Sequence, residues 1–152
     1  MKIVIIIIAS ILIAFLAFKF LSKSNDSITT IGSVDSIESI IENLMKSTNE
    51  YAYLIIKIHG TEDFIQFTAD ANGVQLDLPL ITDRQKDLGS AFRRAGSDLN
   101  LEVIENKGTD GSPFLDINLN GNAAEITNII NQFIGKLFNV SPSTKLVFEY
   151  NI

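Results

Sequence analysis

Several residue types on which common functional sites depend are missing or scarce in this chain. Its 152 residues include no cysteine, no tryptophan, one histidine and three prolines. Without cysteine there is no disulfide framework, no thiolate metal centre and no cysteine nucleophile. A single imidazole also excludes a histidine-rich zinc site. These absences remove the most easily recognised catalytic and metal-binding classes.

The one histidine, His59, stands just before Gly60 at the end of a strand-like stretch. We expect it to be a solvated turn residue. A Ser-His-Asp triad would have to recruit it, and no G-x-S-x-G elbow precedes a predicted helix. We therefore predict that the protein is not an enzyme and has no catalytic residue and no cofactor.

Carboxylate and amide side chains gather around one glycine-rich turn, residues 108–112. The cluster contains Asp110 and Asp116 with Asn106 and Asn118, and calcium prefers such oxygen ligands. Their spacing fits no EF-hand loop, and Asp-Gly is an ordinary turn pair. We therefore predict no metal site, and a carboxylate-dependent enzyme stays as a less favoured alternative.

Charge is unevenly distributed along the chain. All 18 acidic residues lie at or after Asp26, whereas three of the 12 lysine and arginine residues precede it. The acidic part repels nucleic-acid phosphates and anionic lipid head groups. We predict a protein or peptide partner, with a basic one favoured, and no nucleic acid. An acidic surface also keeps a small domain soluble without any partner.

The chain opens with a long hydrophobic run. From Ile3 to Phe18 every residue except Ser10 is apolar, and lysines flank the run. A helix needs about 20 such residues to cross the bilayer core of roughly 30 Å. We therefore predict a transmembrane anchor over residues 1–22, which contacts the lipid bilayer through residues 3–21.

A cleaved signal peptide is the alternative to an anchor. The apolar core of a signal peptide usually has about 7 to 15 residues and ends at a small-x-small site. The run here is longer, and a cut after Ala17 would put Phe15 where a small residue is required. We favour a single-pass membrane protein of the bacterial inner membrane. The flanking lysines differ by one between the two sides, which leaves the side of the soluble domain open.

Residues 23–33 separate the hydrophobic run from the rest of the chain. Ser, Asn, Asp and Thr dominate this segment, and these residues favour turns and extended chain. We predict a flexible linker there, followed by one soluble domain over residues 34–152, which is long enough for one hydrophobic core.

Apolar residues at helical spacing predict three helices in this domain. They cover residues 36–47, 82–96 and 122–137. Each begins with a pair typical of a helix cap, namely Asp35 with Glu38, Thr82 with Gln85 and Asn122 with Glu125. Gly96 is expected to end the second helix.

Alternation of apolar and polar residues predicts six strands. They cover residues 51–59, 63–68, 74–78, 99–103, 115–119 and 145–151. The first has apolar residues on both faces and is expected in the centre of its sheet. Asn72-Gly73 predicts a hairpin turn between the second and third. The fold class is α+β, in the order α-β-β-β-α-β-β-α-β, with an antiparallel sheet packed against helices behind one transmembrane helix.

The first eight of these elements follow the order of the type III secretion chaperone-like, or Tir-chaperone-like, superfamily, and three short segments add to the resemblance. Residues 64–67, Phe-Ile-Gln-Phe, resemble its second-strand aromatic-x-Gln-Phe pattern. Residues 82–89 resemble its helix opening onto a Leu-Gly pair, and residues 137–142 resemble the end of its last helix. The resemblance covers residues 35–142.

The resemblance implies a non-catalytic, often dimeric module that binds extended partner segments over apolar grooves. Two features depart from it, because secretion chaperones are typically free cytosolic proteins and residues 145–151 lie outside the shared core. We expect a membrane-anchored protein-binding or assembly module, with a homodimer among its expected partners. An immunity or inhibitor protein that neutralises a basic partner is the alternative.

Aromatic residues are numerous for one small domain, and we expect most of them in the core. Phe64 and Gln66 occupy the more polar face of their strand by alternation. An outer sheet face that carries a few aromatics leaves an apolar patch suited to a partner. The predicted partner-binding residues are Tyr53, Phe64, Gln66 and Phe114.

Overall fold

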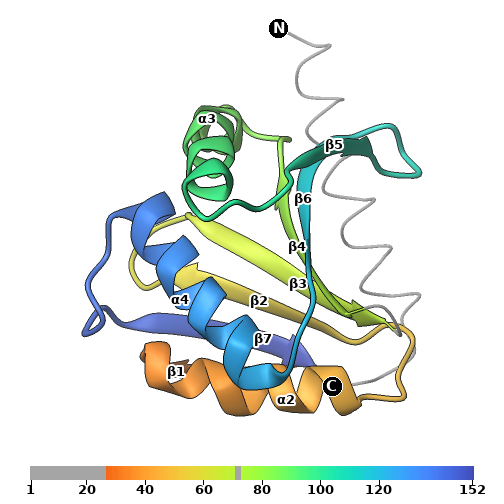
Figure 1. The fold of residues 1–152 in the computed structure, drawn as a ribbon, viewed down its shortest axis with the longest axis vertical. Helices are drawn as coiled ribbons and strands as arrows, with labels where there is room; N and C mark the ends of the chain where they lie inside the picture. The colour runs from red at the N-terminus through yellow and green to blue at the C-terminus, as the bar shows by residue number, and fades with distance from the viewer. Residues whose placement is uncertain (1–26, 71–72) are drawn as a thin grey trace, which may run out of the picture.

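The computed structural model describes residues 27–70 and 73–152, which form an α+β fold with one antiparallel sheet (Figure 1). The strands are β1 (Ile28–Gly32), β2 (Tyr53–Ile58), β3 (Phe64–Asp70), β4 (Gly73–Pro79), β5 (Ile104–Lys107), β6 (Pro113–Leu119) and β7 (Leu146–Asn151). The helices are the 3₁₀ turn η1 (Val34–Ser36), α2 (Ile37–Lys46), α3 (Asp83–Asp98) and α4 (Ala123–Phe138). Within the described residues the strand order is β1-β7-β2-β3-β4-β6-β5.

The hydrophobic core lies between one face of the sheet and the three α-helices. Alternate residues of β2 are buried, as its central place between β7 and β3 requires. The apolar stripe of α4 lies over the sheet and includes Ile130, which is fully buried. Phe133 of α4 meets Phe92 of α3 edge to face, with ring centroids 4.9 Å apart. Burial of these side chains is the main stabilising term of the fold.

Two of the three predicted helix caps are confirmed. Thr82 accepts a hydrogen bond from the Gln85 backbone N–H and Gln85 returns one, and Asn122 and Glu125 do the same at α4. The predicted cap at Asp35 is wrong. Asp35 lies inside η1, so the helix begins one residue later, after Ser36, whose side chain makes no capping hydrogen bond.

The second predicted helix extends past Gly96, its expected end. A Cβ on Gly96 would collide with Val103, so this glycine permits close packing and does not stop the helix. The left-handed turn falls instead at Asn100, with φ of 55°. Because the Leu101 N–H donates back to the Gly96 carbonyl, residues 99–103 form no strand, and β5 begins at Ile104.

The predicted flexible linker over residues 23–33 contains a strand. β1 pairs with β7 in antiparallel register, with Thr30 opposite Phe148. Its Ile and Thr residues are β-branched and suit a strand, and β7 supplies the backbone partners. The turn tendency of the surrounding Ser and Asn residues therefore does not extend over β1, and the folded domain begins before residue 34.

No helix in residues 27–70 and 73–152 is long and apolar enough to cross a membrane. The longest, α3 and α4, have 16 residues each and carry a polar face, whereas a crossing helix needs about 20 apolar residues. The prediction of a transmembrane helix, and with it the single-pass membrane location, is therefore not supported. The apolar run of residues 3–21, on which that prediction was based, lies outside the described residues.

Candidate functional site: the outer face of the sheet

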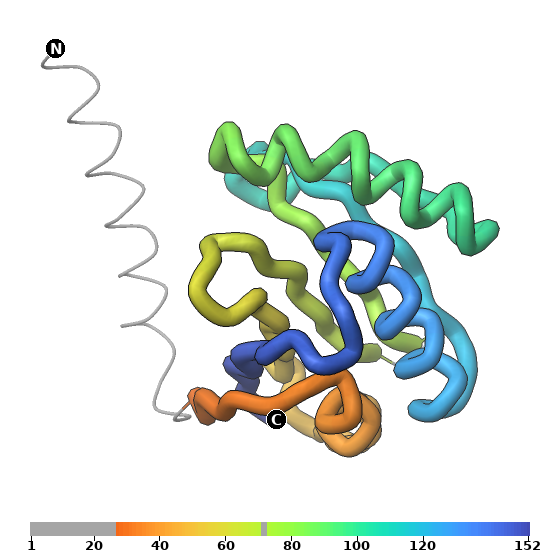
Figure 2. The backbone as a smooth tube through the Cα atoms, turned by 90° about the vertical axis from the view of Figure 1, so that its left-hand side faces the viewer, coloured from red at the N-terminus to blue at the C-terminus, as the bar shows by residue number. Residues whose placement is uncertain are grey.

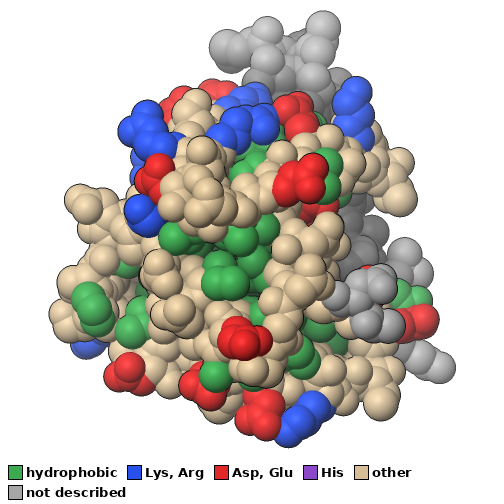
Figure 3. Space-filling model, in the orientation of Figure 1, with side chains coloured by type: hydrophobic (Ala, Val, Ile, Leu, Met, Phe, Trp, Pro, Cys, Tyr) green, Lys and Arg blue, Asp and Glu red, His purple; other side chains and the backbone are tan. Residues whose placement is uncertain are grey.

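All three α-helices pack on the same side of the sheet (Figure 2). No described element covers the opposite side, which is called the outer face below. The helix side carries many of the cations, because α3 contributes Arg84, Lys86, Arg93 and Arg94, and blue side chains gather over α3 in Figure 3. The two sides of the sheet therefore differ in two ways: described helices cover only the helix side, and the cations of α3 lie on that side.

The four residues predicted to bind a partner all lie on this outer face. Tyr53 alternates with buried Leu54 on β2, Phe64 and Gln66 flank buried Ile65 on β3, and Phe114 precedes buried Leu115 on β6. Each of the four is partly buried. They do not form one continuous patch, since β4 lies between β3 and β6.

The space between them is occupied by two acidic residues of adjacent strands. Asp77 of β4 and Asp116 of β6 stand directly opposite each other in the sheet register. Their exposed fractions are only 7% and 3%. In each, the Oδ1 atom is buried and accepts no hydrogen bond from any described residue. Buried acceptors are normally satisfied, so two orphaned oxygens side by side mark this pair as unusual.

Three amide side chains hold the other oxygens of the acid pair. The Oδ2 atom of Asp116 accepts from Gln75 Nε2 at 2.7 Å and from Asn106 Nδ2 at 3.0 Å. Gln66, the residue opposite Asp77 on β3, hydrogen bonds to the Asp77 side chain. The pair is thus fixed from β3, β4 and β5, while one buried oxygen of each acid stays without a donor in the described part of the chain.

Burial and the neighbouring carboxylate change the ionisation of Asp77. Removal of Asp77 from water, and next the charge of Asp116, raise the pKa of Asp77 from 3.8 to about 7, against a smaller opposing effect of the Gln66 hydrogen bond. Two carboxylates on directly opposite residues of neighbouring strands resist simultaneous ionisation. Asp77 is therefore part-protonated at neutral pH, and a proton on it relieves the repulsion.

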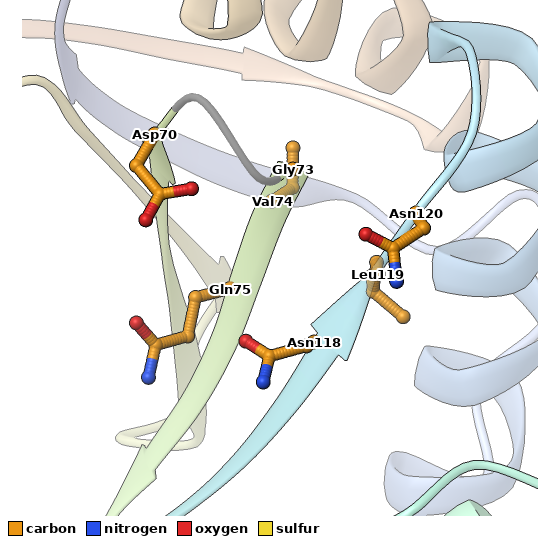
Figure 4. Close-up of a pocket in the computed structure, with 7 residues that line it drawn as sticks. All are labelled: Asp70, Gly73, Val74, Gln75, Asn118, Leu119 and Asn120. Atoms are coloured by element: carbon orange, nitrogen blue, oxygen red, sulfur yellow. The ribbon is translucent and has the colours of Figure 1, made fainter.

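A polar hollow adjoins the acid pair at one end of β4 and β6. Its volume is about 350 Å³, and it is lined by Asp70, Gly73, Val74, Gln75, Asn118, Leu119 and Asn120. The side chains of Gln75 and Asn118 point to the outer side of their strands, whereas Leu119 points toward the helices (Figure 4). Gln75 connects the hollow to the acid pair, because its amide also donates to Asp116.

The predicted cluster around the 108–112 turn is only partly assembled. Asn106 does reach Asp116, but Asp110 binds the backbone N–H and hydroxyl of Ser112, which lower the pKa of Asp110. In the described part of the chain, no group of three or more His, Asp or Glu residues is placed to hold a metal ion. His59 is exposed at the end of β2.

No family model, no curated protein and no solved structure matches this chain. The chemistry of the outer face therefore has to be derived from its own residues. Sequence reasoning placed Asp116 in a different cluster and missed Asp77. The available signal was that Gln75 and Asp77 occupy one alternation face of β4, and Asp116 and Asn118 one face of β6.

Proposed function

We propose that the protein is a non-catalytic binding or assembly module of chaperone-like fold that binds a polypeptide over its outer face. The observation that carries the proposal is the composition of that face. It combines partly buried aromatic side chains with two buried acids whose Oδ1 atoms lack partners, and no described element lies over it (Figure 2). An apolar and acidic sheet face that no described element covers is suited to a protein partner.

The order of the elements supports a chaperone-like fold. Between Ile37 and Phe138 the chain follows α2-β2-β3-β4-α3-β5-β6-α4, the order of the superfamily that the sequence resembles. The two remaining strands, β1 and β7, extend the sheet beyond β2. Two residues of the resembling second-strand pattern, Phe64 and Gln66, lie on the outer face and are available to a partner.

The charge of the outer face favours a basic partner. Its acidic side chains are Asp70, Asp77, Asp116 and Glu149. Lys57 lies on the same face, but Glu149 binds its ammonium group at 2.8 Å. Complementary charge increases the association rate and selects against acidic competitors. An inhibitor of a basic protein would also use an acidic outer face. The two functions differ only in the partner that is bound.

The raised pKa of Asp77 beside Asp116 is the feature that favours a carboxylate-dependent enzyme as the second candidate. A group that titrates near neutral pH suits general acid catalysis. However, both acids are almost fully buried, and the adjoining hollow is lined by three amide side chains and a single carboxylate, that of Asp70. These features fit binding better than turnover.

A peptide selection with the full chain tests the proposed function. Binders taken from a random peptide library are measured against the wild type, Phe64→Thr and Phe114→Thr. The control is Ile81→Thr, because Ile81 is 49% exposed but lies outside the strands that form the outer face. We expect at least a tenfold loss for the two phenylalanine variants and no change for the control. Selection of no binder, or of binders that ignore both phenylalanines, would refute the proposal.

A further inference from the structure

The acid pair carries an inference that deepens the proposed function and rests on it. We propose that Asp77 and Asp116 together recognise one cationic side chain, the guanidinium of arginine or the ammonium of lysine, in the polypeptide that binds the outer face. The pair is then the specificity-determining point of the interface, and the surrounding aromatics supply contact area.

Asp77 and Asp116 each have one buried carboxylate oxygen without a donor in residues 27–70 and 73–152. Asp77 and Asp116 are cross-strand neighbours, whose Cβ atoms lie about 5 Å apart in such a pair. Each has one carboxylate oxygen held by amides and one, Oδ1, with no donor among the described residues. Leaving a buried charged acceptor without a donor is costly. The two Oδ1 atoms therefore offer a place for a group that donates at least two hydrogen bonds.

A group that binds these two oxygens must carry a positive charge. A neutral donor would satisfy the oxygens but would leave two adjacent carboxylates repelling each other. A guanidinium presents parallel N–H groups that match carboxylate oxygens, and its charge offsets the repulsion. The chain contains a guanidinium bound to two carboxylate oxygens elsewhere, although both belong to one acid there: Arg84 donates from Nε and Nη2 to the two oxygens of Asp63 at 2.7 and 2.6 Å.

No lysine or arginine among the described residues is paired with these acids. On the outer face Lys57 is bound to Glu149. Arg93, on the helix side, is bound to Glu105. The other titratable groups of the outer face are Asp70 and Tyr53. Within residues 27–70 and 73–152, the acid pair therefore has no cation of its own.

A metal ion fits the pair less well than an organic cation. The described residues supply only two carboxylates here and no third acidic or histidine ligand. The nearest amides turn their N–H groups, and not their carbonyls, toward Asp116. Calcium requires six to eight oxygen ligands. An organic cation needs only the two Oδ1 atoms that lack donors, and because both atoms are buried, the side chains over them must move for it to bind.

Two short peptides, acetyl-Ala-Arg-Ala-amide and its citrulline counterpart, are each titrated into the full chain. NMR spectroscopy records the backbone signals of the protein during the titration. Citrulline keeps the shape of arginine and removes its charge. We expect the arginine peptide to shift the backbone signals of Asp77 and Asp116 and to bind at least fivefold more tightly than the citrulline peptide. Binding should strengthen from pH 6 to pH 8, because the cation replaces the proton on Asp77. A third peptide, acetyl-Ala-Lys-Ala-amide, should behave like the arginine peptide.

Variants and a metal control complete the test. Asp77→Asn and Asp116→Asn should each weaken arginine binding at least tenfold, whereas the exposed Asp35→Asn should not. Equal binding of the citrulline peptide, or displacement of the arginine peptide by calcium chloride from the same signals, would overturn the inference. If an asparagine variant fails to fold, the arginine-to-citrulline comparison on the wild type still decides.

The failure of this inference is distinguishable from the failure of the proposed function. Peptides selected on the outer face can be resynthesised with citrulline in place of arginine and norleucine in place of lysine. If they still bind, and still depend on Phe114, the binding module stands and the acid pair is not its cation site. If no selected peptide depends on Phe64 or Phe114, the proposed function itself fails.

Discussion

The two faces of strand β4 differ sharply in composition although both are largely shielded from water. Val74, Leu76 and Leu78 face the helices and are at most 1% exposed. Asp77, on the outer face, is 7% exposed, so it is nearly as buried as they are but is ionisable. The inner face stabilises the fold through apolar burial. The outer face tolerates a costly acid pair, which is the kind of local conflict that points to a functional role.

The largest expected effect belongs to the centre of the inner face. Replacing Ile130 by Asp puts an unpaired charge at a fully buried position of α4, and the cost exceeds about 4 kcal/mol. We expect the domain to unfold, as measured by far-UV circular dichroism and thermal melting. The control is Asn128→Asp on the exposed side of α4, which should melt like the wild type. An unchanged melt of the Ile130 variant would contradict the packing of α4 on the sheet.

A smaller loss is expected at the aromatic contact between α3 and α4. Phe133→Ala removes a fully buried ring and should lower the free energy of unfolding by about 3 to 5 kcal/mol. In a double-mutant cycle with Phe92→Ala, the edge-to-face pair should give a coupling of about 0.5 to 1.5 kcal/mol. Urea denaturation measures both values. Strict additivity of the two substitutions would show that the rings do not interact.

The inner face could be predicted from the sequence because its signals are local. The stripe of α4 repeats every three or four residues, and the capping pairs at Thr82 and Asn122 lie within one turn of helix. Alternation also put Phe64 and Gln66 on the outer face without knowledge of the sheet order. The local spacing of apolar residues is therefore sufficient to predict the core and the face of the sheet on which a single side chain lies.

The acid pair could not be predicted, because it depends on which strands become neighbours. Gln75 and Asp116 are 41 residues apart in sequence, with α3 and β5 between them, and only the register of β4 with β6 brings them together. The same reason applies to β1, whose partner β7 is the last strand of the chain. The prediction that Gly96 ends its helix was wrong because the small size of this residue permits a close contact with Val103.

The acid pair predicts an intermediate effect that depends on pH. The pKa of Asp77 is raised to about 7 in the folded protein, so the folded state binds a proton more tightly than the unfolded state. This contribution to stability is fully present below about pH 4 and is lost as the pH rises through about 7. Above pH 7, Asp77→Asn should therefore be more stable than the wild type by about 1 to 3 kcal/mol.

Urea denaturation at pH 4, 6 and 8 measures this difference. The gain of Asp77→Asn over the wild type should grow from pH 4 to pH 8 and then level off. Asp35→Asn, at an exposed position, should follow the wild type at every pH. A gain that is constant with pH would show that Asp77 does not titrate between the folded and unfolded states in this range.

The smallest effect on stability is expected at an outer-face aromatic, where the effect on binding should be largest. Phe114 and Leu115 are adjacent on β6 and point to opposite faces, and only Leu115 is fully buried. Leu115→Ala should cost about 2 to 5 kcal/mol, whereas Phe114→Thr, which introduces a β-branched residue suited to a strand, should cost about 1 kcal/mol or less. Urea denaturation measures the stability of both variants, and a peptide-binding assay is then made on Phe114→Thr. We expect Phe114→Thr to keep the fold and to lose peptide binding. A cost for Phe114→Thr as large as that for Leu115→Ala would mean that this ring belongs to the core, and the contrast between the two faces would then rest on the acid pair alone.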